Sequence, residues 1–202
     1  MRVLHVDASI LGESSVSRQL SGAIVERLRQ AHPEIAVTYY DLGAEPIGHL
    51  TGAHLAAARG AFAESPSLQE DVIRGQQALA DFLSADIVVV GAPMYNFSVS
   101  SQLKAWIDRL AVAGKTFRYT PEGVQGLAGG KKVIVASSRG GFYGPDTPTA
   151  FLDHQETYLR GIFGFFGITD IAFVRAEGLN ASAEQRQTAI AAATAEAARL
   201  AA

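Results

Sequence analysis

The chain has 202 residues, of which 48% are hydrophobic and 18% charged, and its formal net charge at pH 7 is −3. This composition is that of a globular protein with a sizeable core, and it excludes an intrinsically disordered chain. The weakly acidic charge excludes a nucleic-acid groove, which needs a concentrated basic face. The absence of cysteine excludes disulfides, thiol catalysis and thiolate metal sites.

The first half of the chain begins with two predicted strands separated by a helix. Arg2–Asp7 is a short apolar run and is predicted to be the first strand. A helix is predicted to begin among Ser14–Ser17 and to end near His32, because apolar residues recur there at every fourth position. Ile35–Asp41, with alternating apolar residues, is predicted to be the second strand.

A less regular segment follows, from Leu42 to Pro66. It is predicted to contain only a short alanine-rich helix around Ala53–Arg59. The sequence Ser67-Leu68-Gln69-Glu70 then has the form of a capping box, with a hydroxyl at the N-cap and a carboxylate three residues later. A helix whose apolar residues include Phe82 is predicted to start there.

The second half continues the alternation of strands and helices. A helix with a stripe of apolar residues that includes Trp106 is predicted after the third strand, and another is predicted to end near Gly167. The last helix is predicted to start at Ser182, where a second capping box occurs. The remaining strands are predicted at Ile87–Val90, Val133–Ala136 and Ile171–Val174.

Strict alternation of strand and helix indicates an α/β fold in which helices cover both faces of a parallel sheet. With right-handed crossovers and five strands, the doubly wound order 2-1-3-4-5 is the most economical arrangement. No internal repeat or long linker divides the sequence, so residues 1–202 are predicted to form one domain. Ligands of such sheets bind beyond the carboxyl ends of the strands, where the order reverses.

The loop after the first strand is rich in serine. Between Ala8 and Arg18 it contains four serines and a glycine, and it leads into a helix whose N-terminal amides and dipole favour an anion. It lacks both the nucleoside-triphosphate motif and the dinucleotide motif Gly-x-Gly-x-x-Gly, which leaves a phosphate monoester as the favoured ligand. The alternative is that the serines only cap the helix.

The loops after the third and fourth strands also suit a flat ligand. Gly91–Ser100 contains a proline and two aromatic residues separated by an amide, which would offer apolar contact to a ring and polar groups to its edge. Ser137–Pro145 contains paired glycines, whose backbone N–H groups can approach a ligand closely. The alternatives are a core-packing loop with Asn96 in a turn, and a flexible glycine turn.

Together, the three loops resemble those of the FMN-dependent NADH-azoreductases. The segments that carry the resemblance in these loops are Ser9 together with Ser15–Ser17, then Ala92–Phe97, and then Ser138–Gly141. It continues in Ser101–Lys104, Gly114–Tyr119, Gly164–Asp170 and Ala176–Gly178, so it covers nearly the whole chain. It is weakest between about Gly43 and Pro66, and the Met-Tyr-Asn-Phe sequence is its most specific element.

The resemblance implies a flavodoxin-like fold, one FMN per subunit, and a homodimer with active sites at the subunit interface. By that similarity, the FMN phosphate would be held by Ser9, Ser15, Val16 and Ser17. The isoalloxazine would be lined by Met94, Tyr95, Asn96 and Phe97. Its pyrimidine end would be approached by Ser138, Arg139, Gly140 and Gly141.

The resemblance also implies a two-step reaction. NADH or NADPH would pass hydride to FMN, and a quinone or azo compound would then accept the electrons, with cleavage of the azo bond to aromatic amines. The flavin carries this chemistry, so we predict no catalytic side chain. NADH is preferred on the family resemblance alone, and the physiological acceptor stays open.

Four residues outside the loops are weaker candidates. Tyr119, Phe151 and Phe163 are candidates for the walls of a substrate slot, although aromatic residues are more often core. Arg59 is a candidate contact for the phosphates of the dinucleotide, the alternative being a solvated surface side chain.

Other classes of protein fit the sequence less well. A serine hydrolase would need Gly-x-Ser-x-Gly, and a metal site is not predicted because the five histidines are dispersed. His5 is predicted to be a core residue. The main alternative is a flavodoxin-type electron carrier, but such carriers tend to be small and strongly acidic so that they dock on their partners electrostatically.

No segment predicts export or membrane insertion. The sequence from Met1 to Asp7 reaches a charge before any apolar leader segment forms. The longest apolar stretch, Gly161–Ile168, is far shorter than the ~20 residues of a membrane-spanning helix. We therefore expect a cytoplasmic protein that does not act at a membrane.

Overall fold

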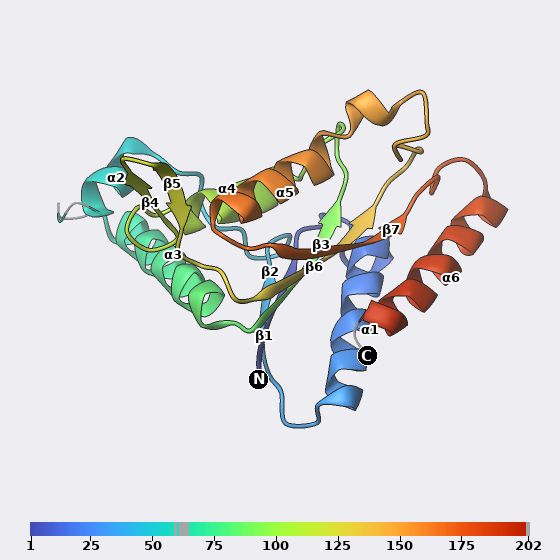
Figure 1. Ribbon diagram of the computed structural model, residues 1–202, viewed down its shortest axis with the longest axis horizontal. Coiled ribbons are helices and arrows are strands. Elements are labelled where there is room, and N and C mark those ends of the chain that lie inside the picture. The colour runs from blue at the N-terminus through green and yellow to red at the C-terminus, as the bar shows by residue number, and fades with distance from the viewer. Residues whose placement is uncertain (59, 61–64, 201–202) are drawn as a thin grey trace.

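Five parallel strands form the central sheet, in the order β2-β1-β3-β6-β7 (Figure 1). The computed structural model describes residues 1–58, 60 and 65–200. The strands are β1 (Arg2–Asp7), β2 (Ala36–Asp41), β3 (Ile87–Pro93), β6 (Lys132–Ser138) and β7 (Asp170–Ala176). Since β6 and β7 are the fourth and fifth predicted strands, the predicted order 2-1-3-4-5 is confirmed.

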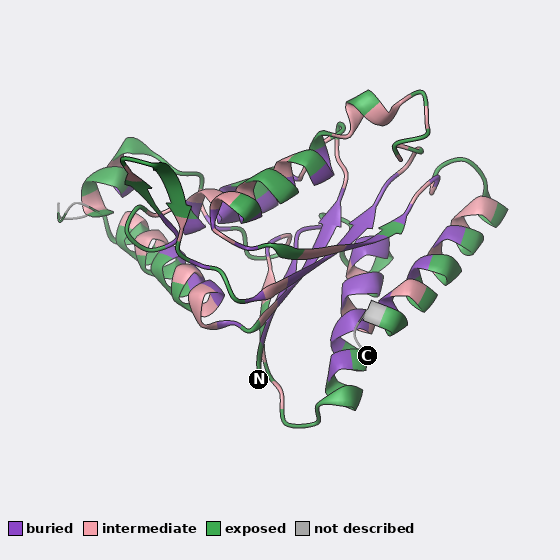
Figure 2. Ribbon diagram, viewed as in Figure 1, coloured by how far each residue is buried: buried purple, intermediate pink, exposed green. Residues whose placement is uncertain are grey.

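Helices cover both faces of the sheet, as predicted (Figure 1). One face carries α1 (Val16–Ala31) and α6 (Ala183–Leu200). The other carries α3 (Pro66–Ser84), α4 (Ser101–Leu110) and α5 (His154–Phe165). The central strands β3 and β6 are buried along almost their whole length (Figure 2), which agrees with their uninterrupted apolar sequences.

The remaining elements are short. The helix α2 (Gly52–Ala58) lies beside α3 and matches the predicted alanine-rich helix, but Arg59, its predicted end, lies outside the described residues. The 3-10 turns η1 and η2 span Gly12–Ser14 and Ala150–Leu152. No helix among the described residues is long and apolar enough to cross a membrane.

The predicted start of α3 is wrong by two residues. Ser65, not Ser67, is the N-cap, and its hydroxyl accepts a hydrogen bond from the Leu68 amide at 3.3 Å. Pro66 is the first helical residue, a position that suits proline because its missing N–H would have no partner there anyway. The cap predicted for α6 is confirmed, since the Ser182 hydroxyl accepts from the Gln185 amide at 3.0 Å.

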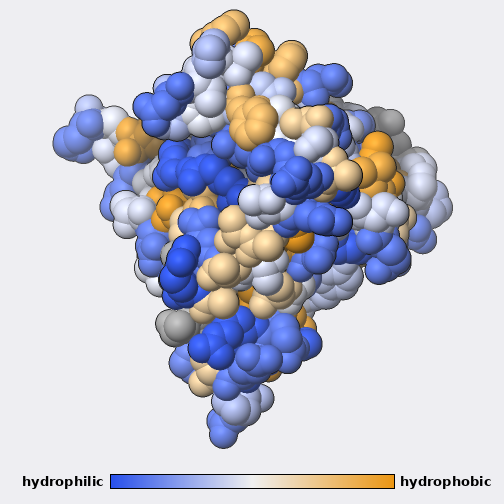
Figure 3. All heavy atoms as spheres, turned by 90° about the vertical axis from the view of Figure 1, so that its right-hand side faces the viewer, coloured by the Kyte–Doolittle hydropathy of each residue, from blue (hydrophilic) through white to orange (hydrophobic). Residues whose placement is uncertain are grey.

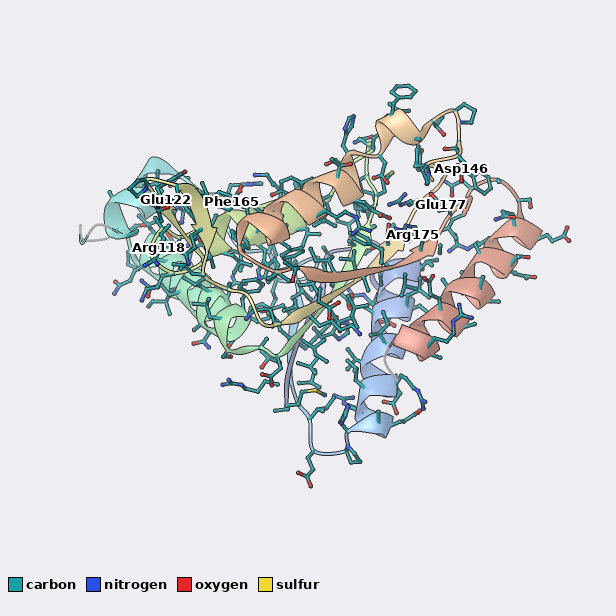
Figure 4. All side chains as sticks on the ribbon, in the orientation of Figure 1. Arg118, Glu122, Asp146, Phe165, Arg175 and Glu177 are labelled. Carbon is teal, nitrogen blue, oxygen red and sulfur yellow. The ribbon has the colours of Figure 1, made fainter. Side chains whose placement is uncertain are left out.

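An antiparallel hairpin between α4 and β6 was not predicted. Its strands are β4 (Phe117–Thr120) and β5 (Gly123–Gly126). Phe117 is its buried residue, and the ring of Phe117 lies 4.6 Å from that of Phe165. Figure 4 shows Arg118 and Glu122 on this hairpin, with Phe165 beside it. The hairpin therefore packs against the C-terminal end of α5.

Close packing between β1 and β3 requires a glycine at position 91. A Cβ on Gly91 would lie 2.1 Å from Asp7 Oδ1, and this carboxylate is held in place by the Ser21 hydroxyl at 2.6 Å. We expect Gly91→Ala to lower the free energy of unfolding by about 1–3 kcal/mol, because the buried carboxylate must move. Urea unfolding would measure this.

A second glycine provides the control for Gly91→Ala. Gly22 lies within α1, and a Cβ there would meet nothing within 4 Å. Gly22→Ala is therefore expected to leave the stability unchanged or to raise it by about 0.5–1 kcal/mol, through helix propensity. Equal effects of the two substitutions would contradict the packing argument.

Candidate functional site

The three loops singled out in the sequence contact one another at the carboxyl edge of the sheet. The Tyr95 hydroxyl lies 3.2 Å from Ser9 Oγ and accepts a hydrogen bond from the Ile10 amide at 3.3 Å, which joins the loops after β1 and β3. The Met94 amide donates to the Ser138 carbonyl at 2.8 Å, which joins the loops after β3 and β6. The three loops that carry the predicted cofactor-binding residues are therefore brought together in one region.

The N-terminus of α1 has the geometry of an anion site. Ser15 is the N-cap, its hydroxyl accepts from the Arg18 amide at 3.2 Å, and it lies 3.1 Å from Ser17 Oγ. Within the described part of the chain, the amides of Val16 and Ser17 have no hydrogen-bond acceptor. The capping role predicted as an alternative is thus real for Ser15, and it leaves two N–H groups free for an anion.

The cationic side chain nearest this helix start is already neutralised. The Arg18 guanidinium donates to both carboxylate oxygens of Asp41, at 2.7 and 2.8 Å. This hydrogen bonding lowers the pKa of Asp41 despite its partial burial, and backbone amides including that of Gly43 act in the same direction. The pair ties the first turn of α1 to the end of β2.

This ion pair predicts a pH dependence of stability. Because the pKa of Asp41 is lower in the folded chain than in the unfolded chain, the pair stabilises the fold above the unfolded pKa of about 4, and the effect is lost as the pH falls below it. Asp41→Asn should lower the free energy of unfolding by roughly 1.5–3 kcal/mol at pH 7. Urea unfolding at several pH values should show that the difference in unfolding free energy between Asp41→Asn and the unsubstituted chain disappears below about pH 4. If this difference stayed constant with pH, the charge of Asp41 would not be its cause.

The loop after β3 is a tight turn with unusual backbone angles. The backbones of Tyr95 and Ser98 exchange hydrogen bonds of 3.0 and 3.1 Å, and the two residues between them, Asn96 and Phe97, have φ values of 47° and 71°. Asn96 is thus in a turn, as the alternative interpretation had it. Asparagine suits this conformation, but phenylalanine there costs roughly 1–2 kcal/mol, and glycine would be favoured for stability alone.

The strained residue is held from two sides. The ring of Phe97 packs edge-on against Tyr143 at 5.9 Å, and its carbonyl accepts from the His154 amide at 3.1 Å. The side chain of Phe97 is nevertheless 40% exposed. A half-exposed aromatic ring on a strained backbone is typical of a functional position and not of a folding requirement.

A cavity of about 790 Å³ lies beside this turn. It is bounded by the loops after β1 and β3, by the start of α4 and by Tyr158 of α5. Its volume lies within the range of small-molecule pockets. Burial raises the pKa of Tyr158 to about 12, so its phenol stays protonated at neutral pH and can donate a hydrogen bond. The cavity is lined by Ile10, Met94–Asn96, Ser98–Gln102, Lys104 and Tyr158.

The glycine loop after β6 is fixed and not flexible. The carbonyls of Gly140 and Gly141 accept from the amides of Asn180 and Gly178, at 3.0 and 2.8 Å. A Cβ on Gly140 would lie 2.6 Å from the amide nitrogen of the Asn180 side chain. Among the described residues, the amides of Gly140 and Gly141 have no acceptor of their own. These two N–H groups are therefore available to a ligand edge.

The side chains of two predicted residues are buried and make their contacts inside the protein. Arg139 is only 1% exposed, and its guanidinium is bonded to carboxylates inside the protein. Phe163 is fully buried in the core, stacked on Phe82 with ring centroids 6.4 Å apart. Its proposed place in a substrate slot is wrong, because its ring packs on Phe82 of α3 and it does not line the cavity.

The other two aromatic candidates are exposed, but they do not line the cavity. Tyr119 on the β4–β5 hairpin is 75% exposed, and Phe151 in the loop between β6 and α5 is 74% exposed. Phe142 in the same loop is 45% exposed. Apolar atoms gather at the upper end of the face drawn in Figure 3, where this loop lies. The remaining candidate, Arg59, lies outside the described residues.

Sequence reasoning missed Tyr158 and the start of α4 as walls of the cavity. A half-buried tyrosine on an amphipathic helix has the same local pattern as a core residue, so nothing in the sequence singles it out. The Ser100 cap of α4, whose hydroxyl accepts from the Leu103 amide at 3.2 Å, was a recognisable signal. It places the start of this helix directly after the strained turn.

Comparison with known proteins agrees with the fold. Residues 1–201 match the profile of a family described as having a flavodoxin-like fold. The chain is 60% identical over 191 residues to a protein of Sinorhizobium medicae named FMN-dependent NADH:quinone oxidoreductase, and the match covers 95% of this chain and 92% of that protein.

Solved structures show the same similarity in three dimensions. An azoreductase from Bacillus anthracis str. Sterne is 34% identical, with a TM-score of 0.87 over 100% of this chain and 98% of the other. An FMN-dependent NADH-azoreductase from Bacillus anthracis str. Ames Ancestor, solved in complex with FMN, is 26% identical, with a TM-score of 0.85 over 100% and 99% of the two chains.

Proposed function

Since the chain belongs to the flavodoxin-like family that contains the FMN-dependent NADH:quinone oxidoreductases and azoreductases, we propose that it binds FMN at its three loops and reduces quinones with NADH. The observation that carries this proposal is the contact of the three loops at one edge of the sheet. The hydrogen bonds of Tyr95 and Met94 join an anion site, an apolar turn and two free glycine amides.

The residues present fit FMN. The phosphate would be held by the free amides at the start of α1 together with the hydroxyls of Ser9, Ser15 and Ser17. The isoalloxazine would lie against Met94–Phe97, where an apolar surface adjoins the cavity. The amides of Gly140 and Gly141 would donate to the pyrimidine edge. Bound FMN would supply the two-electron chemistry, by which hydride from NADH reaches the quinone.

The protein's own part in the reaction is binding, orientation and electrostatics. Backbone amides that already lack acceptors, such as those of Gly140 and Gly141, stabilise negative charge without reorganisation. The protonated hydroxyl of Tyr158 offers a donor to a carbonyl-bearing substrate in the cavity. Because no side chain has to exchange a proton with the substrate in this scheme, we assign no catalytic acid or base.

The proposal extends to azo compounds and to a homodimer. Azo compounds share the flat, electron-poor character of quinones, and structural relatives are named azoreductases. A homodimer with the active sites at its interface would cover the exposed aromatic side chains of Phe97, Phe142 and Phe151. A cytoplasmic location, where NADH is available, is part of the same proposal.

A steady-state comparison of NADH and NADPH against one quinone and one azo dye tests the activity. The FMN-loaded chain should turn over NADH continuously only when an acceptor is present, and parallel lines in double-reciprocal plots would support the two-step reaction. Intersecting lines would contradict it. A chain that keeps FMN but oxidises neither nicotinamide with any quinone would fit an electron carrier instead.

A further inference from the structure

The first turn of α5 is bonded to both of the loops that would hold the isoalloxazine. The backbone amide of His154 donates to the carbonyl of Phe97 at 3.1 Å. The Gln155 side chain bonds to the ends of β3 and β6, and the Glu156 side chain bonds to Arg139. Three consecutive residues of α5 thus contact the turn after β3, the paired ends of β3 and β6, and the loop after β6.

Gln155 is the central member of this set. It is fully buried, its amide nitrogen donates to the Ala92 carbonyl at 3.2 Å, and its amide oxygen accepts from the Ser137 hydroxyl at 2.6 Å. Ser137 Oγ in turn accepts from Arg139 Nε at 3.0 Å, so its single proton is left for Gln155. This requirement fixes the orientation of the Gln155 amide. The side chain bridges Ala92 and Ser137, which are paired in register just before Met94 and Ser138.

A buried cluster of charges holds the loop after β6 from behind. The Arg139 guanidinium is paired with Glu156, with Asp153 at 2.9 Å and with Glu177 at 3.2 Å. Glu177 also accepts from the Tyr143 amide at 2.9 Å. Figure 4 shows Glu177 and Arg175 near the end of β7, below the loop that carries Asp146. The glycine loop therefore rests on charged side chains that come from α5 and from the end of β7.

We propose that the first turn of α5 acts as a clamp, defined as residues 153–156, which supplements the backbone pairing of β3 and β6 and holds the two isoalloxazine loops in position. Within the clamp, Gln155 is a positioning residue for FMN binding. The strained turn at Asn96 and Phe97 needs such support, because positive-φ residues other than glycine persist only where the surroundings over-determine them. The clamp rests on the proposed function, since its purpose is to preorganise the flavin site.

Gln155→Met tests the clamp. Methionine keeps the length of the side chain but removes both hydrogen bonds, so the two loops lose the side-chain link between them and keep only their backbone contacts. The dissociation constant for FMN should rise by about tenfold to a hundredfold. In the FMN-free chain, hydrogen exchange should become faster at the Met94 amide, which bonds across the two loops to Ser138, while the amides between β1 and β2 stay protected.

Gln155→Glu adds a readout that general destabilisation would not produce. A protonated glutamic acid can still donate to the Ala92 carbonyl and accept from Ser137, whereas the ionised form sets a carboxylate against that carbonyl. Charged groups near this position are Arg139 directly after β6, Glu156 on α5 with Asp153 at its N-cap, and Glu177 directly after β7. The ratio of the variant's FMN dissociation constant to that of the unsubstituted chain should increase as the pH rises.

Tyr40→Phe is the matched control. It removes one side-chain hydrogen bond, the 2.7 Å contact of Tyr40 on the edge strand β2 with Asp81 of α3, which is no part of the clamp. It should lower the stability and leave FMN affinity unchanged. The clamp is overturned if Gln155→Met keeps the original affinity, or if the ratio for Gln155→Glu stays flat with pH. If the unsubstituted chain itself fails to bind FMN, the proposed function falls and the clamp with it.

Discussion

Replacing Ser15 with aspartate is expected to weaken FMN binding by roughly a hundredfold or more without destabilising the fold. Aspartate caps a helix as well as serine does, and its charge interacts favourably with the N-terminal end of α1. The same carboxylate would lie beside the free amides of Val16 and Ser17, where we place the phosphate. Two like charges 4 Å apart repel by about 4 kcal/mol at an effective dielectric constant of 20. This repulsion is larger than the free energy that corresponds to a hundredfold loss of FMN affinity.

Two controls separate charge from loop distortion. Ser15→Asn keeps a good cap without the charge, so it should bind FMN within a few-fold of the original affinity. Riboflavin lacks the phosphate, so Ser15→Asp should bind it as the unsubstituted chain does. Fluorescence titration measures both. Equal losses for riboflavin and FMN would indicate a distorted loop, and an unchanged affinity for FMN would remove the phosphate from the start of α1.

The fold could be predicted because its pattern is local. Alternating strands and helices with short connections leave few topologies, and the doubly wound order is the simplest of them. The strand ends were less predictable. β3 continues to Pro93 and β6 to Ser138, because Ala92 pairs with Ser137 and Pro93 with Ser138 in register. Proline and serine are poor signals for a strand, so only the pairing reveals these residues as part of the sheet.

The loops of the site were predictable, but their supports were not. Each loop is marked by a local pattern that spans only a few residues. These patterns are serines before a helix, aromatic residues after a buried strand, and paired glycines. Gln155 contacts a carbonyl 63 positions away in the chain, and no local pattern marks it. Arg139 shows a different limit, since its place beside Gly140 suggests a ligand contact, while nothing local predicts that Glu156 and Glu177, distant in sequence, hold its side chain.

Arg139→Met is expected to lower the free energy of unfolding by about 3–5 kcal/mol. The guanidinium is 1% exposed, and its removal would leave the carboxylates of Asp153, Glu156 and Glu177 without their shared partner. Arg175 still pairs with Glu156, at 2.5 and 2.7 Å, so part of the charge stays compensated. Denaturant unfolding of the FMN-free chain measures the loss.

Arg160→Met is the corresponding change at an exposed arginine, which lies on α5. Arg160 is half exposed, and its guanidinium lies 3.8 Å from Glu156 and stacks on Phe173. Its replacement should cost less than about 1 kcal/mol, since exposed ion pairs are screened by water. If both variants lost the same stability, burial would not decide the strength of these pairs. If only Arg139→Met lost stability and loosened the glycine loop, the charges behind that loop would be what holds Gly140 and Gly141 ready for a ligand.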